Sequence, residues 1–189
     1  VLLNIQNKQG NSHYYDVKHE ERLYPSTTEL NNGTKLIVNG NNNIVMGLNT
    51  NLSGNEDTKL ILNNTNLKAS TINLDGNSSL TVNNTSGEAI SIDDGAEITA
   101  TGEQKVHFKG TSDISLSGRF IGKGSAEANG VVVLENATLT RRGNDRNINW
   151  TLNSGTLKYL SDSFLSENSL TMNGGSLDLR NGEVTDIQL

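Results

Sequence analysis

Histidines and carboxylates gather in one stretch near the start of the chain. His13 and His19 lie six residues apart, and the acidic residues that accompany them are Asp16, Glu20 and Glu21. Imidazole and carboxylate groups are ligands for zinc. The stretch has no regular period, however, and a solvated loop explains it better. We therefore predict no metal site and no bound cofactor.

His107 is the one histidine that lies in a regular pattern. It stands between Val106 and Phe108, which places it on the outward face of an expected strand. A serine hydrolase needs a nucleophile beside such a base, and the chain contains no Gly-x-Ser-x-Gly run. We expect an exposed histidine that is available for contacts, and no catalytic base.

Clustered carboxylates would be needed by a polysaccharide lyase or a glycoside hydrolase. The nearest candidates are Asp93, Asp94 and Asp113. Asp93 and Asp94 precede Gly95, so a turn already explains them. We predict that the chain is not an enzyme, and a β-helical lyase or hydrolase stays as a weaker alternative.

The one basic cluster of the chain lies in residues 141–146. Its arginines are separated by glycine and asparagine and follow no period, which is typical of a loop. Such a loop could meet an acidic glycan, although a solvated turn is the simpler interpretation. The candidate surface contacts of the chain are Arg141, Arg142, Arg146, His107, Tyr14 and Tyr15.

The composition excludes several functional classes. The net charge is −6 and is spread along the chain, which disfavours nucleic acid and anionic membranes as partners. Without cysteine there is no disulfide framework and no thiolate metal site. Only 33% of the residues are hydrophobic and 4% are aromatic, too few for a conventional globular core. Strict periodicity nevertheless argues against disorder and favours a repeat fold.

A short repeat organises residues 71–118. Polar and apolar residues alternate over four positions, and two turn-forming residues follow, as in the segment 71–76 (TINLDG). This alternation is typical of a strand with one buried face, and Asn, Asp and Gly tolerate the positive φ of a corner. Asparagines at successive corners are expected to stack and to hydrogen-bond along the axis.

The spacing between strands predicts a coil with three faces. Every third strand falls near the same phase, with 24 residues from Leu36 to Leu60 and 26 from Ile72 to Ile98. The distances from Leu80 to Val106 and from Ile90 to Ile114 are similar. We therefore predict an all-β, three-faced β-solenoid of about six to seven turns. A sandwich or antiparallel barrel fits less well because the core residues are small and the turns repeat.

One domain is expected. We interpret residues 1–189 as a single β-helix fragment truncated at both ends, with an irregular excursion or cap over residues 10–30 and regular rungs over residues 31–189. The chain begins without methionine and both ends have strand character, so we expect it to be cut from a longer array.

Two segments near the end carry a family resemblance. Residues 147–152 (NINWTL) and 170–179 (LTMNGGSLDL) resemble the passenger domain of Gram-negative bacterial autotransporters, and residues 31–40 (NNGTKLIVNG) are similar. The resemblance covers about residues 30–189. It implies a right-handed parallel β-helix that crosses the outer membrane through a C-terminal β-barrel outside this stretch and works at the cell surface. Two-partner-secreted exoproteins have similar rungs.

The resemblance implies an extracellular adhesin. Its expected partner is a host-cell surface protein or glycan, or an identical passenger on a neighbouring cell, with no nucleic acid. The main alternative is the β-helical stalk of a secreted serine-protease or toxin autotransporter whose active domain lies upstream.

Overall fold

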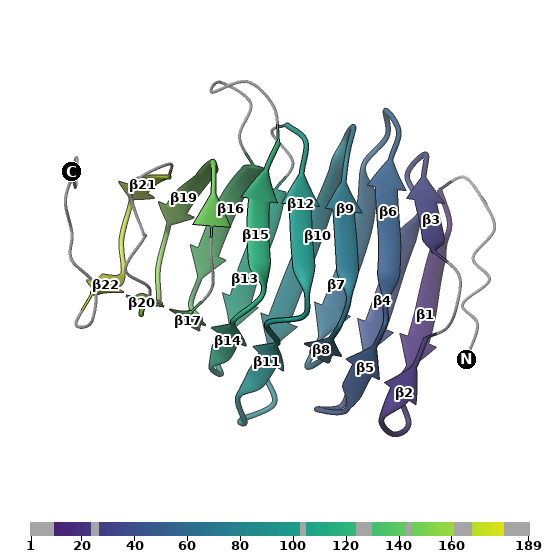
Figure 1. Ribbon diagram of the computed structural model, residues 1–189, viewed down its shortest axis with the longest axis horizontal. Helices are drawn as coiled ribbons and strands as arrows, with labels where there is room; N and C mark the ends of the chain where they lie inside the picture. Colours follow the sequence, from purple (N-terminus) through teal and green to yellow (C-terminus); the bar gives the residue numbers. More distant parts are fainter. Residues whose placement is uncertain are drawn as a thin grey trace.

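The protein folds into one parallel β-coil. The computed structural model describes residues 10–23, 27–102, 105–123, 130–142, 145–160 and 168–179. Over these residues the chain is all-β, and Figure 1 shows the strands stacked side by side along the long axis, from β1–β3 (purple) to β21 and β22 (yellow). Among them there is no helix long and apolar enough to cross a membrane.

Three parallel sheets form the faces of the coil, with eight, eight and six strands. Sheet A comprises β1 (Ser12–Asp16), β4 (Lys35–Asn39), β7 (Thr58–Asn63), β10 (Ser78–Asn84), β13 (Lys105–Gly110), β16 (Gly130–Glu135), β19 (Ile148–Leu152) and β21 (Ser169–Met172). Sheet B comprises β2 (Glu21–Arg22), β5 (Ile44–Met46), β8 (Asn66–Lys68), β11 (Ile90–Ile92), β14 (Ile114–Leu116), β17 (Thr138–Arg141), β20 (Thr156–Tyr159) and β22 (Ser176–Asp178). Sheet C comprises β3 (Thr28–Asn31), β6 (Asn49–Ser53), β9 (Thr71–Leu74), β12 (Glu97–Ala100), β15 (Arg119–Gly122) and β18 (Asp145–Arg146).

The strand register confirms the predicted three-faced solenoid, with about six turns. Leu36 pairs with Leu60, and Ile72 pairs with Ile98, as their spacing predicts. The pairs Leu80–Val106 and Ile90–Ile114 are also in register. Parallel pairing across a turn leaves each residue stacked on its counterpart one turn earlier. Side chains of one kind therefore form continuous rows along the axis.

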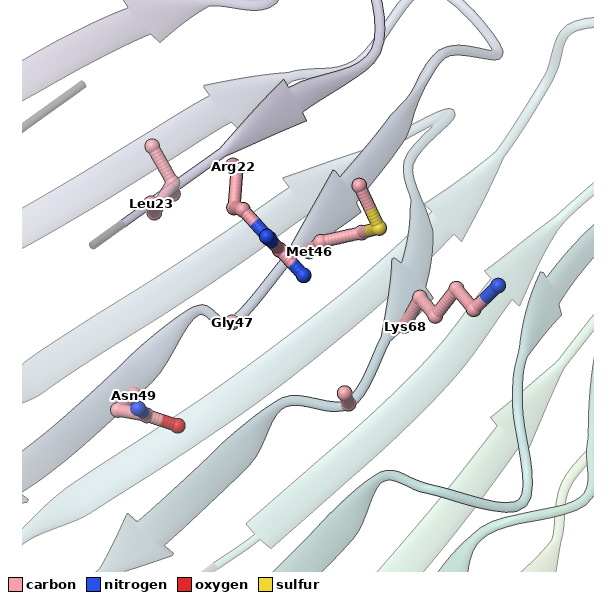
Figure 2. A pocket seen from close by; sticks show the side chains of 7 residues that line it. Arg22, Leu23, Met46, Gly47, Asn49 and Lys68 are labelled. Atoms are coloured by element: carbon pink, nitrogen blue, oxygen red, sulfur yellow. The ribbon is translucent and has the colours of Figure 1, made fainter. Parts of the chain in front are cut away.

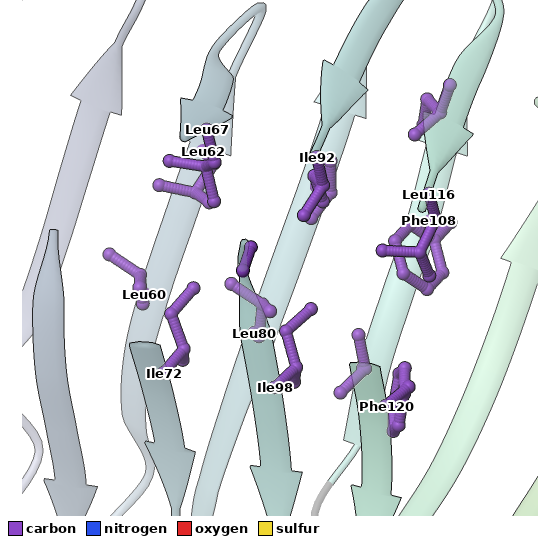
Figure 3. Packing of buried hydrophobic residues seen from close by; sticks show 14 of the residues in the cluster. Leu60, Leu62, Leu67, Ile72, Leu80, Ile92, Ile98, Phe108, Leu116 and Phe120 are labelled. Atoms are coloured by element: carbon purple, nitrogen blue, oxygen red, sulfur yellow. The ribbon is translucent and has the colours of Figure 1, made fainter. Parts of the chain in front are cut away.

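The core is a set of inward rows, one or two from each sheet (Figure 3). The three rows at mid-coil are Leu62, Val82 and Phe108 from sheet A, Leu67, Ile92 and Leu116 from sheet B, and Ile72, Ile98 and Phe120 from sheet C. All of these side chains are buried. Each contributes about 1.5–3 kcal/mol through burial, so a modest set of aliphatic residues suffices when every turn covers the next.

The corners use asparagine and glycine as predicted. Asn32, Asn64 and Asn136 have φ between 51° and 56°, in the left-handed region that asparagine tolerates. At one corner glycine is required by space as well. Gly110 has a φ of +124°, and a Cβ there would lie 2.1 Å from the carbonyl oxygen of Asn84.

The first described turn corrects the prediction of an irregular excursion over residues 10–30. β1, β2 and β3 pair in parallel with β4, β5 and β6, so the described residues of this stretch, 10–23 and 27–30, form part of a rung of the coil. The sequence pattern hid it because His13, Tyr15 and Glu21 occupy inward positions that aliphatic residues fill one turn later. Residues 1–9, where a first strand was expected, and residues 180–189 lie outside the described part.

Candidate functional site

An outward row of sheet A contains two of the predicted contact residues, Tyr14 and His107, which are four strands apart. Tyr14, Ile37, Ile61, Thr81 and His107 are successive partners on β1, β4, β7, β10 and β13. Tyr14 is 72% exposed, and the other four are half-buried. We call Tyr14, Ile37 and Ile61 the apolar row. Outward strand positions in a solvated sheet are normally polar, so this apolar row is unusual.

A second row runs beside the apolar row on one side. Ser12, Lys35, Lys59 and Ser79 are stacked partners, two residues before the apolar row on each strand. Lys35 and Lys59 are direct neighbours on adjacent strands, and like charges in that position repel. Lys59 has a counter-charge at the corner, because its Nζ lies 2.8 Å from Asp57 Oδ2. We call Lys35 and Lys59 the lysine pair.

A hydrogen-bonded ladder runs along the other side of the apolar row. Asn39 Nδ2 donates to Asp16 Oδ1 (2.8 Å), Asn63 Nδ2 to Asn39 Oδ1 (3.1 Å), and Asn83 Nδ2 to Asn63 Oδ1 (3.3 Å). The predicted stacking of asparagines is thereby confirmed. A carboxylate only accepts hydrogen bonds. Asp16 at the base therefore orients every amide of this asparagine ladder in the same direction.

Sheet C carries a shorter ladder with the same design. Asn51 Nδ2 donates to Glu29 Oε1 and Asn73 Nδ2 donates to Asn51 Oδ1, both at 2.8 Å. An acidic residue again stands at the first position. No apolar row lies beside it in the same turns, because the flanking outward residues Asn49 and Thr71 are polar. The apolar row therefore distinguishes sheet A from sheet C at this end of the coil.

Tyr15 does not share the exposed face with Tyr14. It pairs with Val38, whose side chain is fully buried, and it packs half-buried against the hydrophobic core. Adjacent residues of a strand point to opposite faces, so Tyr15 lies on the inward side, away from the row that contains Tyr14. The role of Tyr15 as a surface contact stays a prediction.

Arg141 is fully buried, which contradicts its prediction as a surface contact. It ends β17 at an inward position, between Leu116 and Tyr159 in the row of sheet B. Its Nε donates to Asp145 Oδ1 (2.7 Å) and its Nη1 donates to the Leu116 carbonyl (2.8 Å). The alternation of β17 indicates this inward position, because Arg141 follows the inward Leu139 by two residues.

Asp145 and Tyr159 complete this buried cluster. The Tyr159 hydroxyl donates a hydrogen bond to Asp145 Oδ2 (2.8 Å). Burial raises the pKa of the Asp145 carboxyl, while the Arg141 charge and the hydrogen bonds from Arg141 and Tyr159 oppose that rise. Burial, and then the negative charge of Asp145, raise the pKa of the Tyr159 hydroxyl above its usual value. The cluster is sealed inside the coil and presents no group to a ligand.

The other two arginines of the cluster at residues 141–146, Arg142 and Arg146, are exposed but lie apart from the sheet A face. Arg142 follows the end of β17 in sheet B, and Arg146 lies on the outward side of β18 in sheet C. The expected loop over 141–146 is therefore wrong at both ends, where strands run. Residues 143 and 144 are outside the described part.

The carboxylates considered for an enzyme do not converge. Asp93 Oδ1 accepts hydrogen bonds from the backbone of Ala69 and Gly95, which confirms its turn role. Asp113 lies just before β14, whereas Asp93 and Asp94 follow β11, at the opposite end of the sheet B strands. Within the described ranges no three histidine or acidic side chains are grouped so that they could hold a metal ion.

A hollow that the sequence did not reveal lies at a corner between sheets B and C (Figure 2). Its volume is about 490 Å³. Arg22, Met46 and Lys68 line it from adjacent strands of sheet B, and Asn49 lines it from β6. The two cations make it a positively charged depression. Its wall includes Leu23, next to residues 24–26, which are outside the described part.

Comparisons with known proteins give no relative for this chain. No family model, no curated protein and no solved structure matches it.

Proposed function

We propose that this chain is part of an extracellular adhesin, a passenger segment of a bacterial autotransporter that acts at the cell surface. The observation that carries the proposal is the outward face of sheet A. There the apolar row, the lysine pair and the asparagine ladder lie side by side in register over adjacent turns. Exposed apolar groups in an ordered polar surround are typical of interaction sites.

The coil suits this role because its shape is fixed from within. Inward rows fill the interior, and hydrogen-bonded ladders hold outward amides in place on two sheets. A rigid face loses little conformational entropy when a partner binds. Contacts that repeat once a turn also add up along the axis, so a partner can gain affinity from many weak interactions. The proposed binding partner is a host-cell surface molecule or an identical passenger on a neighbouring cell.

The direct test is to display the passenger on a non-adherent bacterium. Clumping and binding to cultured host cells are then compared with those of bacteria carrying the empty display system. The protein is also displayed with Tyr14→Ser, Ile37→Thr and Ile61→Thr together, which makes the apolar row polar. We expect adhesion with the native face and its loss with this variant. Equal clumping and equal host-cell binding with and without the passenger would reject the function.

A control variant keeps the test specific to the face. Ser91, Ser115 and Thr140 are outward residues of sheet B in one row, and changing each to alanine alters a different face to a similar extent. Adhesion should survive these changes. Surface display of every variant is measured with an antibody against a terminal tag, so that poor export is not mistaken for lost adhesion.

A further inference from the structure

The face of sheet A breaks two local rules of sheet design in the same turns. Ile37 and Ile61 occupy outward positions where polar residues would cost nothing. Lys35 and Lys59 stack on each other although like charges on paired strands repel. Places where a sequence violates such rules without structural benefit are the expected places of function. The core does not require these four residues, since none of them belongs to it.

Charge is distributed unevenly between the corners and this face. The chain has a net charge of −6. Many of its acids are exposed at the corners, namely Glu56, Asp57, Asp75, Glu88, Asp94 and Asp113. The face of sheet A presents Lys35 and Lys59 side by side, and Lys59 is also within 2.8 Å of Asp57 at the corner. In the ladder row Lys109 lies further along the coil, with Asp16 and Glu135 as the acidic members of that row. A negatively charged ligand would therefore be attracted to the lysine pair and repelled from the acidic corners.

The asparagine ladder keeps hydrogen-bonding capacity for a ligand. Each side-chain amide has two N–H groups and two acceptor lone pairs. Asn39 and Asn63 each use one N–H and one lone pair of the oxygen along the ladder. Both side chains are half-exposed. Each therefore retains one donor and one acceptor site toward solvent, as hydroxyl groups of a ligand require.

We propose that this face binds a linear anionic polysaccharide that lies along the axis of the coil. The lysine pair contacts carboxylate or sulfate groups, the apolar row packs against the C–H faces of the sugar rings, and the asparagine ladder bonds hydroxyls. The three kinds of contact occur together on the two adjacent strands β4 and β7, about 4.8 Å apart, and parts of the set continue on β1 and β10. A polymer with short repeating units can use them in succession. This inference rests on the proposed adhesin function and assigns its ligand class.

The test measures binding of the purified chain to immobilised polysaccharides. Heparan sulfate and hyaluronan are the anionic probes, dextran is the uncharged probe, and duplex DNA is the polyanion of another class. We expect binding to at least one anionic polysaccharide and none to dextran. Lys35→Gln with Lys59→Gln removes two exposed ion pairs with the ligand and should weaken binding about tenfold. Tyr14→Ser should weaken it without changing its dependence on salt.

A charge-matched control separates this face from general attraction. Lys68→Gln with Lys158→Gln removes two lysines from the outward side of sheet B. This variant should bind nearly as tightly as the native chain. An equal loss with both double variants, binding to dextran, or tighter binding to DNA than to either polysaccharide would each overturn the proposal. Thermal melting of every variant verifies that the coil is intact.

The two proposals fail in different ways. In one outcome the purified native chain binds no anionic polysaccharide, and the displayed variant with Lys35→Gln and Lys59→Gln adheres to cells as well as the native chain does. The ligand assignment is then wrong, and the adhesin function stands. If purified protein binds the polysaccharide through this face but displayed protein gives no adhesion, the adhesin function is wrong and the binding face stands.

Discussion

Tyr159 donates a hydrogen bond to Asp145 inside the coil, with 2.8 Å between the hydroxyl oxygen and Oδ2. The two residues come from different sheets, β20 of sheet B and β18 of sheet C. The other carboxylate oxygen of Asp145 accepts the hydrogen bond of Arg141 Nε at 2.7 Å. A tyrosine, a carboxylate and a guanidinium thus connect two sheets and two turns in a region otherwise filled by apolar side chains.

Removing one member of this cluster should destabilise the coil strongly. In Arg141→Met the Asp145 carboxylate keeps its burial and loses its cation, so we expect a loss of about 3–5 kcal/mol in the free energy of unfolding. Urea denaturation followed by the fluorescence of Trp150 measures it, because this is the one tryptophan of the chain and it is buried in the same part of the coil.

The complete replacement of the cluster is the control for that experiment. Arg141→Met, Asp145→Leu and Tyr159→Phe together remove both charges of the cluster, and such replacements are often neutral or stabilising by about 1–4 kcal/mol. We expect the triple variant to be more stable than Arg141→Met alone. A triple variant less stable than the single one would show that the cluster contributes more than its charges cost.

The raised pKa of Tyr159 predicts a loss of stability at alkaline pH. The folded state holds the proton more tightly than the unfolded chain, whose tyrosine titrates near pH 10. The stabilisation is complete below about pH 10 and falls as the pH rises further, by about 1.4 kcal/mol per pH unit. Tyr159→Phe should lack this dependence. Urea denaturation between pH 9 and pH 12 distinguishes the two, and identical slopes would contradict the prediction.

The asparagine ladder should tolerate a change at its base better than one in its middle. Asp16→Asn keeps an acceptor for Asn39 Nδ2, so its cost should be small. Asn39→Asp removes that donor and places two carboxylates on adjacent strands, with an expected cost of about 1–3 kcal/mol at pH 7. Like charges raise each other's pKa, so the deficit should shrink as the pH falls toward 4. Thermal melting across this range provides the measurement.

Two glycines with positive φ separate backbone strain from steric contact. Gly87 has a φ of +85° with nothing within 4 Å of an added Cβ, whereas at Gly110 that Cβ meets the Asn84 carbonyl at 2.1 Å. Gly87→Ala should cost about 1–2 kcal/mol, the usual penalty of a left-handed residue. Gly110→Ala should cost at least about 3 kcal/mol. Comparable urea midpoints for the two variants would show that the backbone moves to relieve the contact.

The sequence by itself determined the architecture of this protein. The alternation of Ile, Leu and Val with polar residues, the recurrence of phase every third strand and the asparagine corners all follow from short-range pattern. A repeat fold turns such a pattern directly into register, and Leu36–Leu60 and Ile72–Ile98 pair accordingly. The stacking of asparagines was predictable for the same reason.

The tertiary structure alone decided which side chains share a face and which are hidden. Arg141 sits in a stretch that reads as a basic loop, and its burial depends on Asp145 and Tyr159, which other strands bring to it. The described residues of the first rung, 10–23 and 27–31, are held in place by pairing with the next turn, although His13, Tyr15 and Glu21 occupy inward positions. Tyr14 and His107 lie far apart in the sequence and belong to one row only because five turns stack in register. Strand pairing between turns is a long-range interaction, so the pattern within one turn cannot reveal which residues become neighbours along the axis.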